Sequence, residues 1–204
     1  MNKNALFSLT YGLYLATSGI NNKYNGCIID TVMQITDEPV QICIAVNKHN
    51  LTNEMIAKST IFNICPLTVN APADLFSHFG YQSGRNVDKF KDLEHVDYSK
   101  NGLPYLTKNT NAYLSAKVFE QKDFETHTLF LAKIEDSEIL SDEPSVTYSY
   151  YQQNIKKDIS TNTNTAKKRG YICQVCGYIY EGDSLPDDFV CPVCKRGAEV
   201  FVPI

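Results

Sequence analysis

Residues 171–204 read YICQVCGYIYEGDSLPDDFVCPVCKRGAEVFVPI. The stretch holds four of the chain's seven cysteines, in two Cys-x-x-Cys pairs with 14 residues between them. Two such pairs on tight turns direct four thiolates at one centre, and tetrahedral sulfur ligation selects zinc or iron. The cysteine count alone leaves iron and structural zinc both open. The stretch therefore predicts a metal centre whose ligands are Cys173, Cys176, Cys191 and Cys194.

The residues around the two pairs form a more specific pattern, CxxCGY…CPxC. With this pattern the segment resembles a rubredoxin, and its short insert between the pairs is similar to the rubredoxin-like end of rubrerythrins. Glycine after a ligand cysteine permits a turn in which backbone N–H groups point at sulfur and tune the metal's potential. The resemblance implies a one-electron Fe(Cys)4 centre, with aromatic residues beside the metal at Tyr180, Phe189 and Phe201.

Length and charge bound the organisation of the chain. Its 204 residues suffice for one ordinary domain and a small one, in which a metal replaces a large core. The net charge of −4 offers no basic surface for nucleic acid, so we expect no nucleic-acid partner. Residues 170–204 carry five acids and two bases, which makes the small domain acidic.

The beginning of the chain and the cysteine count bear on location. Ser8, Thr10 and Tyr11 interrupt the apolar tendency of the first residues, so no cleaved signal and no membrane span are expected. An odd number of cysteines that includes two metal pairs fits a reducing compartment better than a disulfide framework. These features predict a cytoplasmic protein without a membrane partner.

Hydrophobic periodicity indicates a mainly β fold. Aromatic and β-branched residues alternate in six expected strands, at 5–16, 28–36, 40–46, 60–65, 112–120 and 126–135. Two short helices are expected, one capped by Thr52 and one running from Pro72 to Gly80. The pattern predicts a largely antiparallel sheet closed into a barrel, with short peripheral helices.

The chain after Tyr151 is almost free of apolar side chains and rich in Thr, Asn and Lys. Such composition is typical of a linker. A flexible linker of this length has a mean end-to-end distance on the order of 20–25 Å. We therefore expect a first domain at 1–152, a linker at 153–169 and the metal domain at 170–204.

A one-electron metal centre needs a source of single electrons, and a flavin is the natural converter from hydride donors. Residues 17–90 resemble the flavin reductase-like family of FMN-binding split barrels, in particular its flavoredoxin branch. The resemblance rests on the segments TSGINNKYNGCIIDTVMQIT, AVNKHNLTNEMI and FGYQSGRNVDKF. It covers nearly all of residues 1–152 and implies FMN as the cofactor.

The resemblance also implies which residues meet the isoalloxazine ring. Asn25, Gly26 and Cys27 would lie against the ring, with glycine allowing close approach of the backbone. Further along the ring and the ribityl chain it places Gln34, Ile35 and Thr36. Phe79 and Tyr81 are placed to cover the flavin or the nicotinamide. The chain has no Rossmann GxGxxG motif, so a nicotinamide would stack on the flavin in an open cleft.

The flavin phosphate needs a polar or cationic cradle. A hydroxyl and N–H donors at the start of a helix, together with nearby cations, meet this need. Taken singly, such cations are more often solvated surface charges, so their place in the family's motifs is what favours them. The residues expected to form the cradle are Asn47, Lys48, Asn50, Thr52, Ser83, Arg85 and Lys89.

Several residues with reactive side chains have plainer interpretations. Cys43 and Cys65 lie in apolar strand runs and are expected to be buried packing residues. Cys27 could tune or react with a flavin ring, although a free cysteine more often serves as a small packing residue. The four histidines share no metal spacing. Tyr148 and Tyr151 resemble a C-terminal feature of the same family, and simple packing explains them equally well.

The combined pattern predicts an electron-transfer enzyme that resembles the high-molecular-weight rubredoxins of anaerobes. NAD(P)H would reduce FMN, the flavin would pass electrons singly to the iron, and the iron would reduce an external protein. The resemblance implies a flavodiiron protein as acceptor, in oxygen or nitric oxide detoxification, and a homodimer that closes the flavin cleft. The alternative hypothesis is a non-enzymatic FMN carrier with a zinc-stapled interaction module.

Overall fold

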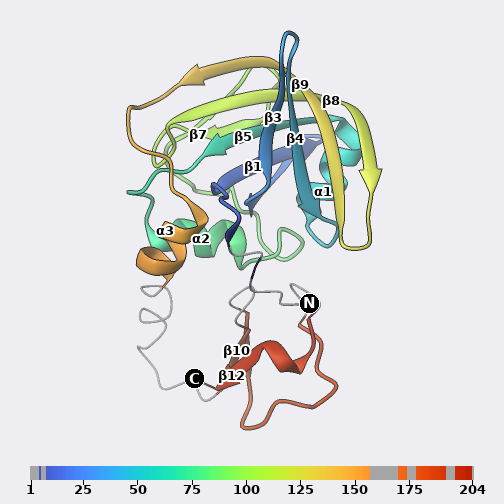
Figure 1. Cartoon of the computed structure of the whole chain (residues 1–204), viewed down its shortest axis with the longest axis vertical. Helices are drawn as coiled ribbons and strands as arrows, with labels where there is room; N and C mark the ends of the chain where they lie inside the picture. Colours follow the sequence, from blue (N-terminus) through green and yellow to red (C-terminus); the bar gives the residue numbers. More distant parts are fainter. Residues whose placement is uncertain (1–4, 6–7, 157–169, 174–177, 192–195, 204) are drawn as a thin grey trace.

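The computed structural model describes residues 5, 8–156, 170–173, 178–191 and 196–203. The larger domain is built on one antiparallel seven-stranded sheet in the order β2-β1-β5-β8-β9-β4-β3, which curls around a core (Figure 1). Its strands are β1 (Tyr14–Ile20), β2 (Lys23–Ile29), β3 (Val32–Asp37), β4 (Val40–Asn47), β5 (Ile61–Pro66), β8 (Ala112–Asp123) and β9 (His127–Ile139).

The sheet starts with a tight hairpin that the periodicity missed, because residues 17–27 lie between the strands expected at 5–16 and 28–36. Asn21 and Asn22 join β1 to β2 and both have positive φ, 52° and 61°. Two left-handed residues in a two-residue turn give the twist that suits a hairpin, and asparagine tolerates that conformation well. The hairpin places Asn25 opposite Ser18 and Cys27 opposite Ala16.

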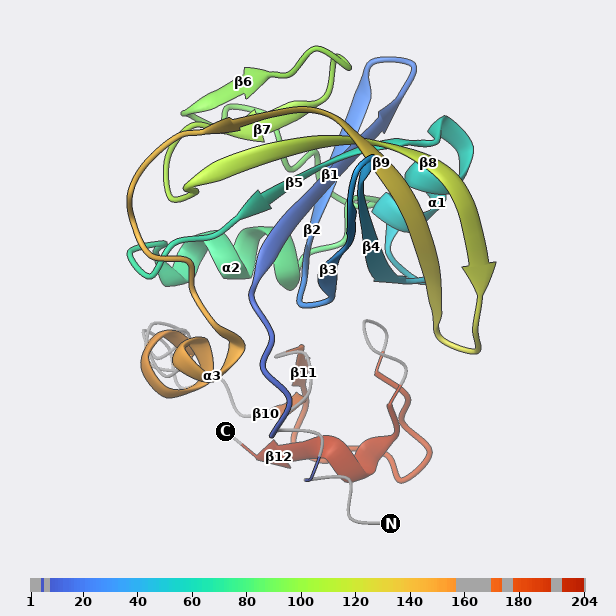
Figure 2. The same ribbon diagram turned by 45° about the horizontal axis from the view of Figure 1, so that its top comes forward.

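The two longest strands bend the sheet toward a barrel. β8 and β9 pair over most of their length, and their register shifts between Ser115 and Ala116 and again between Val118 and Glu120. Each bulge adds a residue to one strand, which increases local twist and bends the pair. In Figure 2 both strands arch over β1 and β5 as a result.

Short helices cover one end of the sheet. α1 (Leu51–Ser59) packs against β1 and β2, and α2 (Ala73–Gly80) packs against β2. The chain then forms the small sheet of β6 (Val96–Tyr98) and β7 (Pro104–Leu106). After β9 it returns through α3 (Tyr148–Tyr150) into a π-helix, η2 (Tyr151–Ile155).

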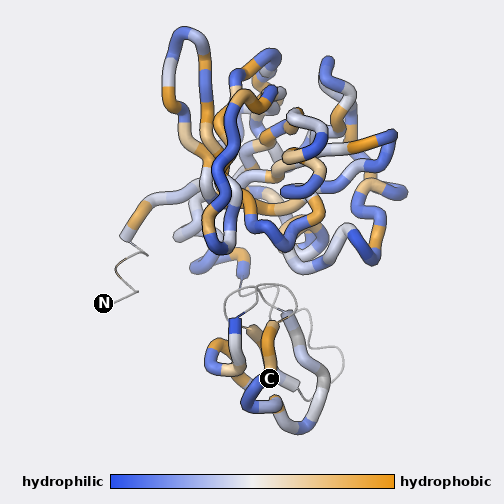
Figure 3. The backbone as a smooth tube through the Cα atoms, turned by 90° about the vertical axis from the view of Figure 1, so that its right-hand side faces the viewer, coloured by the Kyte–Doolittle hydropathy of each residue, from blue (hydrophilic) through white to orange (hydrophobic). Residues whose placement is uncertain are grey.

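Two groups of buried side chains form the core of the larger domain. One lies under α2 and includes Leu15, Phe76 and Phe79, and the other lies inside the curled sheet around Phe62 and Phe130. Both combine residues from strands far apart in sequence. Hydrophobic and hydrophilic stretches alternate along the chain in this domain, as Figure 3 shows.

The small domain has its own three-stranded antiparallel sheet in the order β11-β10-β12. It consists of β10 (Gly170–Cys173), β11 (Ile179–Glu181) and β12 (Phe201–Pro203), with a 3-10 turn, η4 (Ala198–Val200), before the last strand. Its core is a third cluster, which joins Cys173 and Cys191 to Phe201.

The structure confirms the mainly β class and corrects several boundaries. The strand expected at 5–16 is wrong in its first part, because regular strand structure begins at Tyr14. The run at 28–36 is two strands, separated at Asp30 and Thr31. The helical segment after β9 reaches Ile155, inside the range expected to be linker. Among the described helices, none has the length and apolar character to cross a membrane.

Candidate cofactor groove and metal centre

Two adjoining cavities open beside β2 and the ends of α1 and α2. The small pocket, of about 90 Å³, is polar, and its lining includes Asn25, Cys27, Asn50, Ser83, Gly84 and Lys89. The large pocket, of about 300 Å³, carries most of the aromatic residues, and its lining includes Asp30, Tyr81, His127, Tyr148, Tyr151 and Lys156. Both cavities share Ile28, Asn50 and Gly80, so they form one continuous groove.

Strand β2 supplies the buried wall of the small pocket. The Asn25 side chain is 3% exposed and donates from Nδ2 to Thr52 Oγ1 at 2.9 Å. Gly84 faces this amide, and a Cβ at Gly84 would collide with the Asn25 side chain. The sequence motifs contain both residues, but their mutual contact could be found only in three dimensions.

Gly26 and Cys27 occupy tighter positions than the sequence suggested. A Cβ on Gly26 would lie 3.0 Å from Leu15 and 3.1 Å from the Phe79 ring, so a larger residue would have to displace these side chains. Phe79 itself is buried, with 1% exposure, in the cluster under α2. Burial raises the pKa of the Cys27 thiol, while hydrogen bonds from Thr52 and Asn50 and the charge of Lys89 oppose the rise.

Lys89 is the unexpected feature of the small pocket. Its side chain was expected to be a surface cation unless it bound the cofactor, yet Lys89 is 2% exposed. Nζ donates to the carbonyl oxygens of Gly26 at 2.9 Å and Phe79 at 2.8 Å. Burial lowers the pKa of Lys89 to about 8, an effect that the charge of Cys27 opposes.

The beginning of α1 forms the junction of the two pockets. The helix starts at Leu51 with Asn50 as its N-cap, so the expectation that Thr52 caps it is wrong. Thr52 is buried and its hydroxyl accepts from Asn25 instead. Asn47 stands before the helix and its Oδ1 accepts from His49 N at 2.9 Å, which orders this turn.

Two expected phosphate ligands lie outside the lining of both pockets. Lys48 faces Asp123, with Nζ 3.8 Å from Oδ2. Arg85 forms a two-pronged ion pair with Glu54, and both side chains are nearly half exposed. Ser83, by contrast, lines the small pocket, and its hydroxyl accepts from Arg85 N at 3.3 Å. The loop between them therefore turns the serine inward and the guanidinium outward.

The β3 residues that were expected to lie along the flavin ring are also separate from the groove. Gln34, Ile35 and Thr36 lie on the hairpin of β3 and β4, and none of them lines either pocket. Gln34 Nε2 donates to Asp37 Oδ1 at 2.5 Å, and Thr36 Oγ1 donates to the Pro39 carbonyl at 2.5 Å. These bonds stay within the hairpin. Within the chain, the structure therefore does not bring these three residues to the other candidates.

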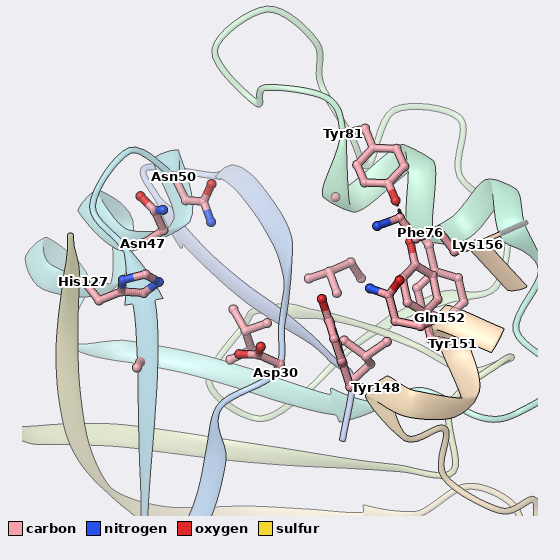
Figure 4. A pocket seen from close by; sticks show the side chains of 15 residues that line it. Asp30, Asn47, Asn50, Phe76, Tyr81, His127, Tyr148, Tyr151, Gln152 and Lys156 are labelled. Atoms are coloured by element: carbon pink, nitrogen blue, oxygen red, sulfur yellow. Dashed lines mark hydrogen bonds between the residues drawn. The ribbon is translucent and has the colours of Figure 1, made fainter. Parts of the chain in front are cut away.

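Sequence reasoning missed most of the large pocket. Figure 4 shows Tyr81 and Tyr151 directed toward one another on one side, with Asp30 and His127 on other walls. The Tyr81 and Tyr151 hydroxyls are 2.5 Å apart, and burial raises the pKa of Tyr151 above its ordinary value. The spacing of Tyr148 and Tyr151 was the available signal. No pattern linked it to Asp30 or His127, which come from β-strand ends far away in sequence.

The charges of the groove are unequally distributed. Asp30 and Lys156 both line the large pocket, so this end carries charges of both signs. Asp30 interacts there with His127, whose pKa burial lowers. Lys89 lies in the small pocket, next to the start of α1, where the helix dipole favours negative charge. One end of the groove thus suits an anion and the other an aromatic group. A flavin mononucleotide has this combination, so the groove fits the cofactor.

The metal domain repeats one turn geometry at its two cysteine pairs. Cys173 N donates to the Tyr178 carbonyl and Cys191 N to the Arg196 carbonyl, each at 2.8 Å and each five residues onward. Both cysteines are fully buried. The partners Cys176 and Cys194 lie outside the described residues. Because the first cysteine of each pair lies in one core and makes the same backbone hydrogen bond, the described part of the site fits a tetrathiolate metal centre.

An aromatic shell encloses these cysteines. Phe189 lies between Tyr180, 4.7 Å away between ring centroids, and Phe201, 5.3 Å away. Tyr178 stacks at 6.4 Å on Phe189. Edge-to-face contacts of this kind stabilise a core beyond simple burial and keep water from it. The prediction that aromatic residues form this core is confirmed.

Cys43 and Cys65 match their plainer interpretation, whereas two of the histidines, His49 and His127, line the groove. Cys43 and Cys65 are buried at 7% and 0% exposure, as predicted, and burial raises the pKa of Cys65 to about 12. His78 Nε2 lies 2.6 Å from the Lys89 carbonyl oxygen and so supports the loop that carries Lys89. His49 lines the small pocket.

Comparisons with known proteins agree with both parts of the structure. Residues 6–157 match the flavin reductase-like domain, and residues 171–202 match the rubredoxin-like domain of rubrerythrin. A high molecular weight rubredoxin from Moorella thermoacetica is 35% identical over 231 aligned residues, covering all of both chains. A ferric-chelate reductase (NAD(P)H) from Archaeoglobus fulgidus is 34% identical and covers 81% of this chain and 96% of its own.

Solved structures support the fold of the larger domain. Flavoredoxin from Methanosarcina acetivorans aligns with a TM-score of 0.60 and 24% identity, over 68% of this chain and 73% of its own. An FMN-binding protein from Thermus thermophilus, solved with p-hydroxybenzaldehyde, aligns with a TM-score of 0.62 and 19% identity. The alignment covers 69% of this chain and 82% of that protein. The chain is an oxidoreductase of the flavin reductase-like family, homologous over its whole length to a high molecular weight rubredoxin and ending in a rubredoxin-like domain.

Proposed function

We propose that the protein carries electrons from NAD(P)H through FMN to an Fe(Cys)4 centre and on to an acceptor protein. The single observation that carries the proposal is the joining of two sites in one chain. A groove with a cationic end and an aromatic end lies in one domain, and paired cysteine turns lie in the other. FMN supplies hydride acceptance and one-electron release when bound, which the iron centre requires.

The charges of the groove support one orientation of FMN. Its phosphate belongs in the small pocket, near Lys89, Ser83 and the N–H groups that begin α1. Its ring belongs in the large pocket, between Tyr81 and the β-strand ends. In this orientation Asn25 and Cys27 lie nearer the phosphate than the ring, which differs from the arrangement that the family resemblance suggested.

The residues of the groove act by position and by excluding water. Ile28 and Gly80 line both pockets, so the ribityl chain would pass beside them. The Tyr81 and Tyr151 pair walls the large pocket with hydroxyl groups that bond to each other. The nicotinamide would stack on the exposed face of the ring in this open pocket. Hydride transfer then needs orientation and no acid–base residue.

We further propose that the protein is a homodimer. Met33, Ile35 and Val40 are 61%, 44% and 43% exposed on the β3–β4 hairpin, a concentration of apolar side chains that a second copy would cover. Across a two-fold axis, Gln34, Ile35 and Thr36 would reach the groove of the other subunit rather than their own. Light scattering tests this, because a Met33→Glu and Val40→Glu protein should be monomeric and should bind FMN less tightly.

The acceptor should dock on the acidic small domain. Residues 170–204 carry a net charge of −3, and a ferric tetrathiolate adds another negative charge. We propose a flavodiiron protein with a basic patch as the acceptor, in a cytoplasmic detoxification of oxygen or nitric oxide. Exposed charges of this kind steer association and are screened over about 8 Å at physiological salt. Asp187→Lys with Asp188→Lys should slow acceptor reduction and leave reduction of the flavin unchanged.

The deciding experiment is anaerobic reduction of the purified protein. NADH or NADPH is added, and the flavin and iron absorption bands are followed separately. We expect the flavin band to bleach first and the iron band to follow. A protein that is colourless apart from its flavin would support the zinc-stapled carrier instead. Iron that bleaches without prior flavin reduction would contradict the proposed order of transfer.

A further inference from the structure

Lys89 is a buried cation at the edge of a cavity. Its side chain is 2% exposed, and two of its three N–H bonds are used by the carbonyl oxygens of Gly26 and Phe79. Of the carboxylates that the structure describes, none forms an ion pair with Lys89. A buried ammonium with only neutral partners is costly unless an anion reaches it. The small pocket, which Lys89 lines, is the space in which such an anion fits.

None of the described groups packed around Lys89 serves as the anion that its ammonium needs, which leaves this role to a ligand. From β2, the Cys27 thiol faces Lys89, and burial raises the pKa of this thiol. His49 lines the same pocket at the start of α1. On the loop of Lys89 itself, Arg85 is paired with Glu54, and Asp88 accepts from Phe90 N. From α2, His78 contacts the Lys89 carbonyl oxygen rather than its amine.

We propose that Lys89 couples proton binding to anion binding in the small pocket, so that a phosphomonoester is held only while this amine carries its proton. The inference rests on the proposed function and identifies the end of the flavin that the pocket recognises. A phosphate monoester is a dianion above about pH 7, since its second pKa is near 6. Lys89 supplies the matching buried charge, and the N–H groups that begin α1 supply further donors.

The sign of the pH dependence follows from burial. In the protein without ligand, burial lowers the pKa of Lys89 to about 8. A bound dianion favours the charged form and raises that pKa again. Binding therefore takes up a proton near pH 8.5, and affinity falls as the pH rises through 8. Riboflavin lacks the phosphate, so its binding should neither take up this proton nor weaken over the same range.

Calorimetric titration of the cofactor-free protein tests the proposal. FMN and riboflavin are each titrated between pH 7 and pH 10, in buffers with different ionisation enthalpies, which report proton uptake. The FMN dissociation constant should rise by up to about tenfold per pH unit above pH 8, as expected for one linked proton. The riboflavin constant should stay level. If the FMN dissociation constant stays level across this range and no proton is taken up, the proposal is overturned, and measurements on the wild-type protein suffice to show this.

Variants assign the effect to Lys89. Lys89→Met should bind FMN more weakly than the wild type and without this pH dependence, while its affinity for riboflavin stays unchanged. Lys91→Met is the matched control, because Lys91 is exposed two residues away and should bind FMN as the wild type does. Inorganic phosphate should compete with FMN in the wild type and leave riboflavin binding unchanged. If the protein binds neither flavin at any pH, the proposed function fails; if it binds FMN independently of pH, only the role of Lys89 fails.

Discussion

The two domains build their cofactor sites in opposite ways. In the metal domain each described cysteine, Cys173 and Cys191, donates its backbone N–H to the carbonyl of the residue five positions later. The groove of the larger domain draws its residues from β2, the starts and ends of two helices, β9 and the π-helix. A local site is encoded by spacing. A distributed site depends on sheet order, and this difference sets what each domain loses when it is damaged.

The largest expected effect is on the metal domain. Cys191→Ser should abolish the iron absorbance and unfold the small domain, because metal binding supplies roughly 10 kcal/mol or more to such a domain. FMN should stay bound to the larger domain with unchanged affinity. Absorption spectra and circular dichroism of the purified variant check both results. Full iron absorbance in Cys191→Ser would show that the ligands are assigned wrongly.

Truncation tests where the larger domain ends. Ile155 is 7% exposed and packs in the cluster under α2, so a fragment ending at residue 156 keeps it and one ending at 152 loses it. Both fragments should be yellow and reducible by nicotinamide. The shorter should be less stable by about 2–4 kcal/mol, the usual cost of removing a large buried side chain. Urea unfolding measures the difference, and equal stability would place the boundary at 152.

The pH dependence of stability sharpens the contrast, because it involves only the larger domain. Lys89 has a lowered pKa, about 8, in the folded protein without ligand, and an ordinary, higher value when unfolded. Between these values the unfolded state binds more protons, so the Lys89 contribution makes stability rise with pH. The rise should be on the order of 1 kcal/mol per pH unit above pH 8. Urea titrations of the cofactor-free wild type and Lys89→Met should differ in this slope, and parallel slopes contradict the assignment.

The smallest effect is expected at the aromatic wall of the groove. Tyr151→Phe removes the hydroxyl that bonds Tyr81 and keeps the ring, which should cost about 0.5–1.5 kcal/mol. Tyr150→Phe is the control, since Tyr150 is 40% exposed and lies next to it in sequence. Thermal unfolding with FMN present compares the two. An identical midpoint for both variants would mean that the hydroxyl pair contributes nothing to the wall.

The sequence by itself determined the metal domain and the class of the larger one. The two Cys-x-x-Cys pairs act through neighbours in the chain, so their spacing specifies the turns that present them. Strand alternation likewise reports which face of a strand is buried, whatever strand lies next to it. The strand boundaries were predicted less well. A break at Asp30 divides the run expected at 28–36, and most of the hairpin around Asn21 and Asn22 lies outside the expected strands.

The tertiary structure alone decided the groove. Spacing could not show that Lys89 turns inward to two carbonyl groups while Arg85 turns outward to Glu54, since both lie on one loop. Nor could spacing predict that Tyr151, at the end of the domain, contacts Tyr81 at the end of α2. Whether a charged side chain is buried depends on which distant backbone groups receive it. That choice is made by sheet order and helix packing, which no local pattern contains.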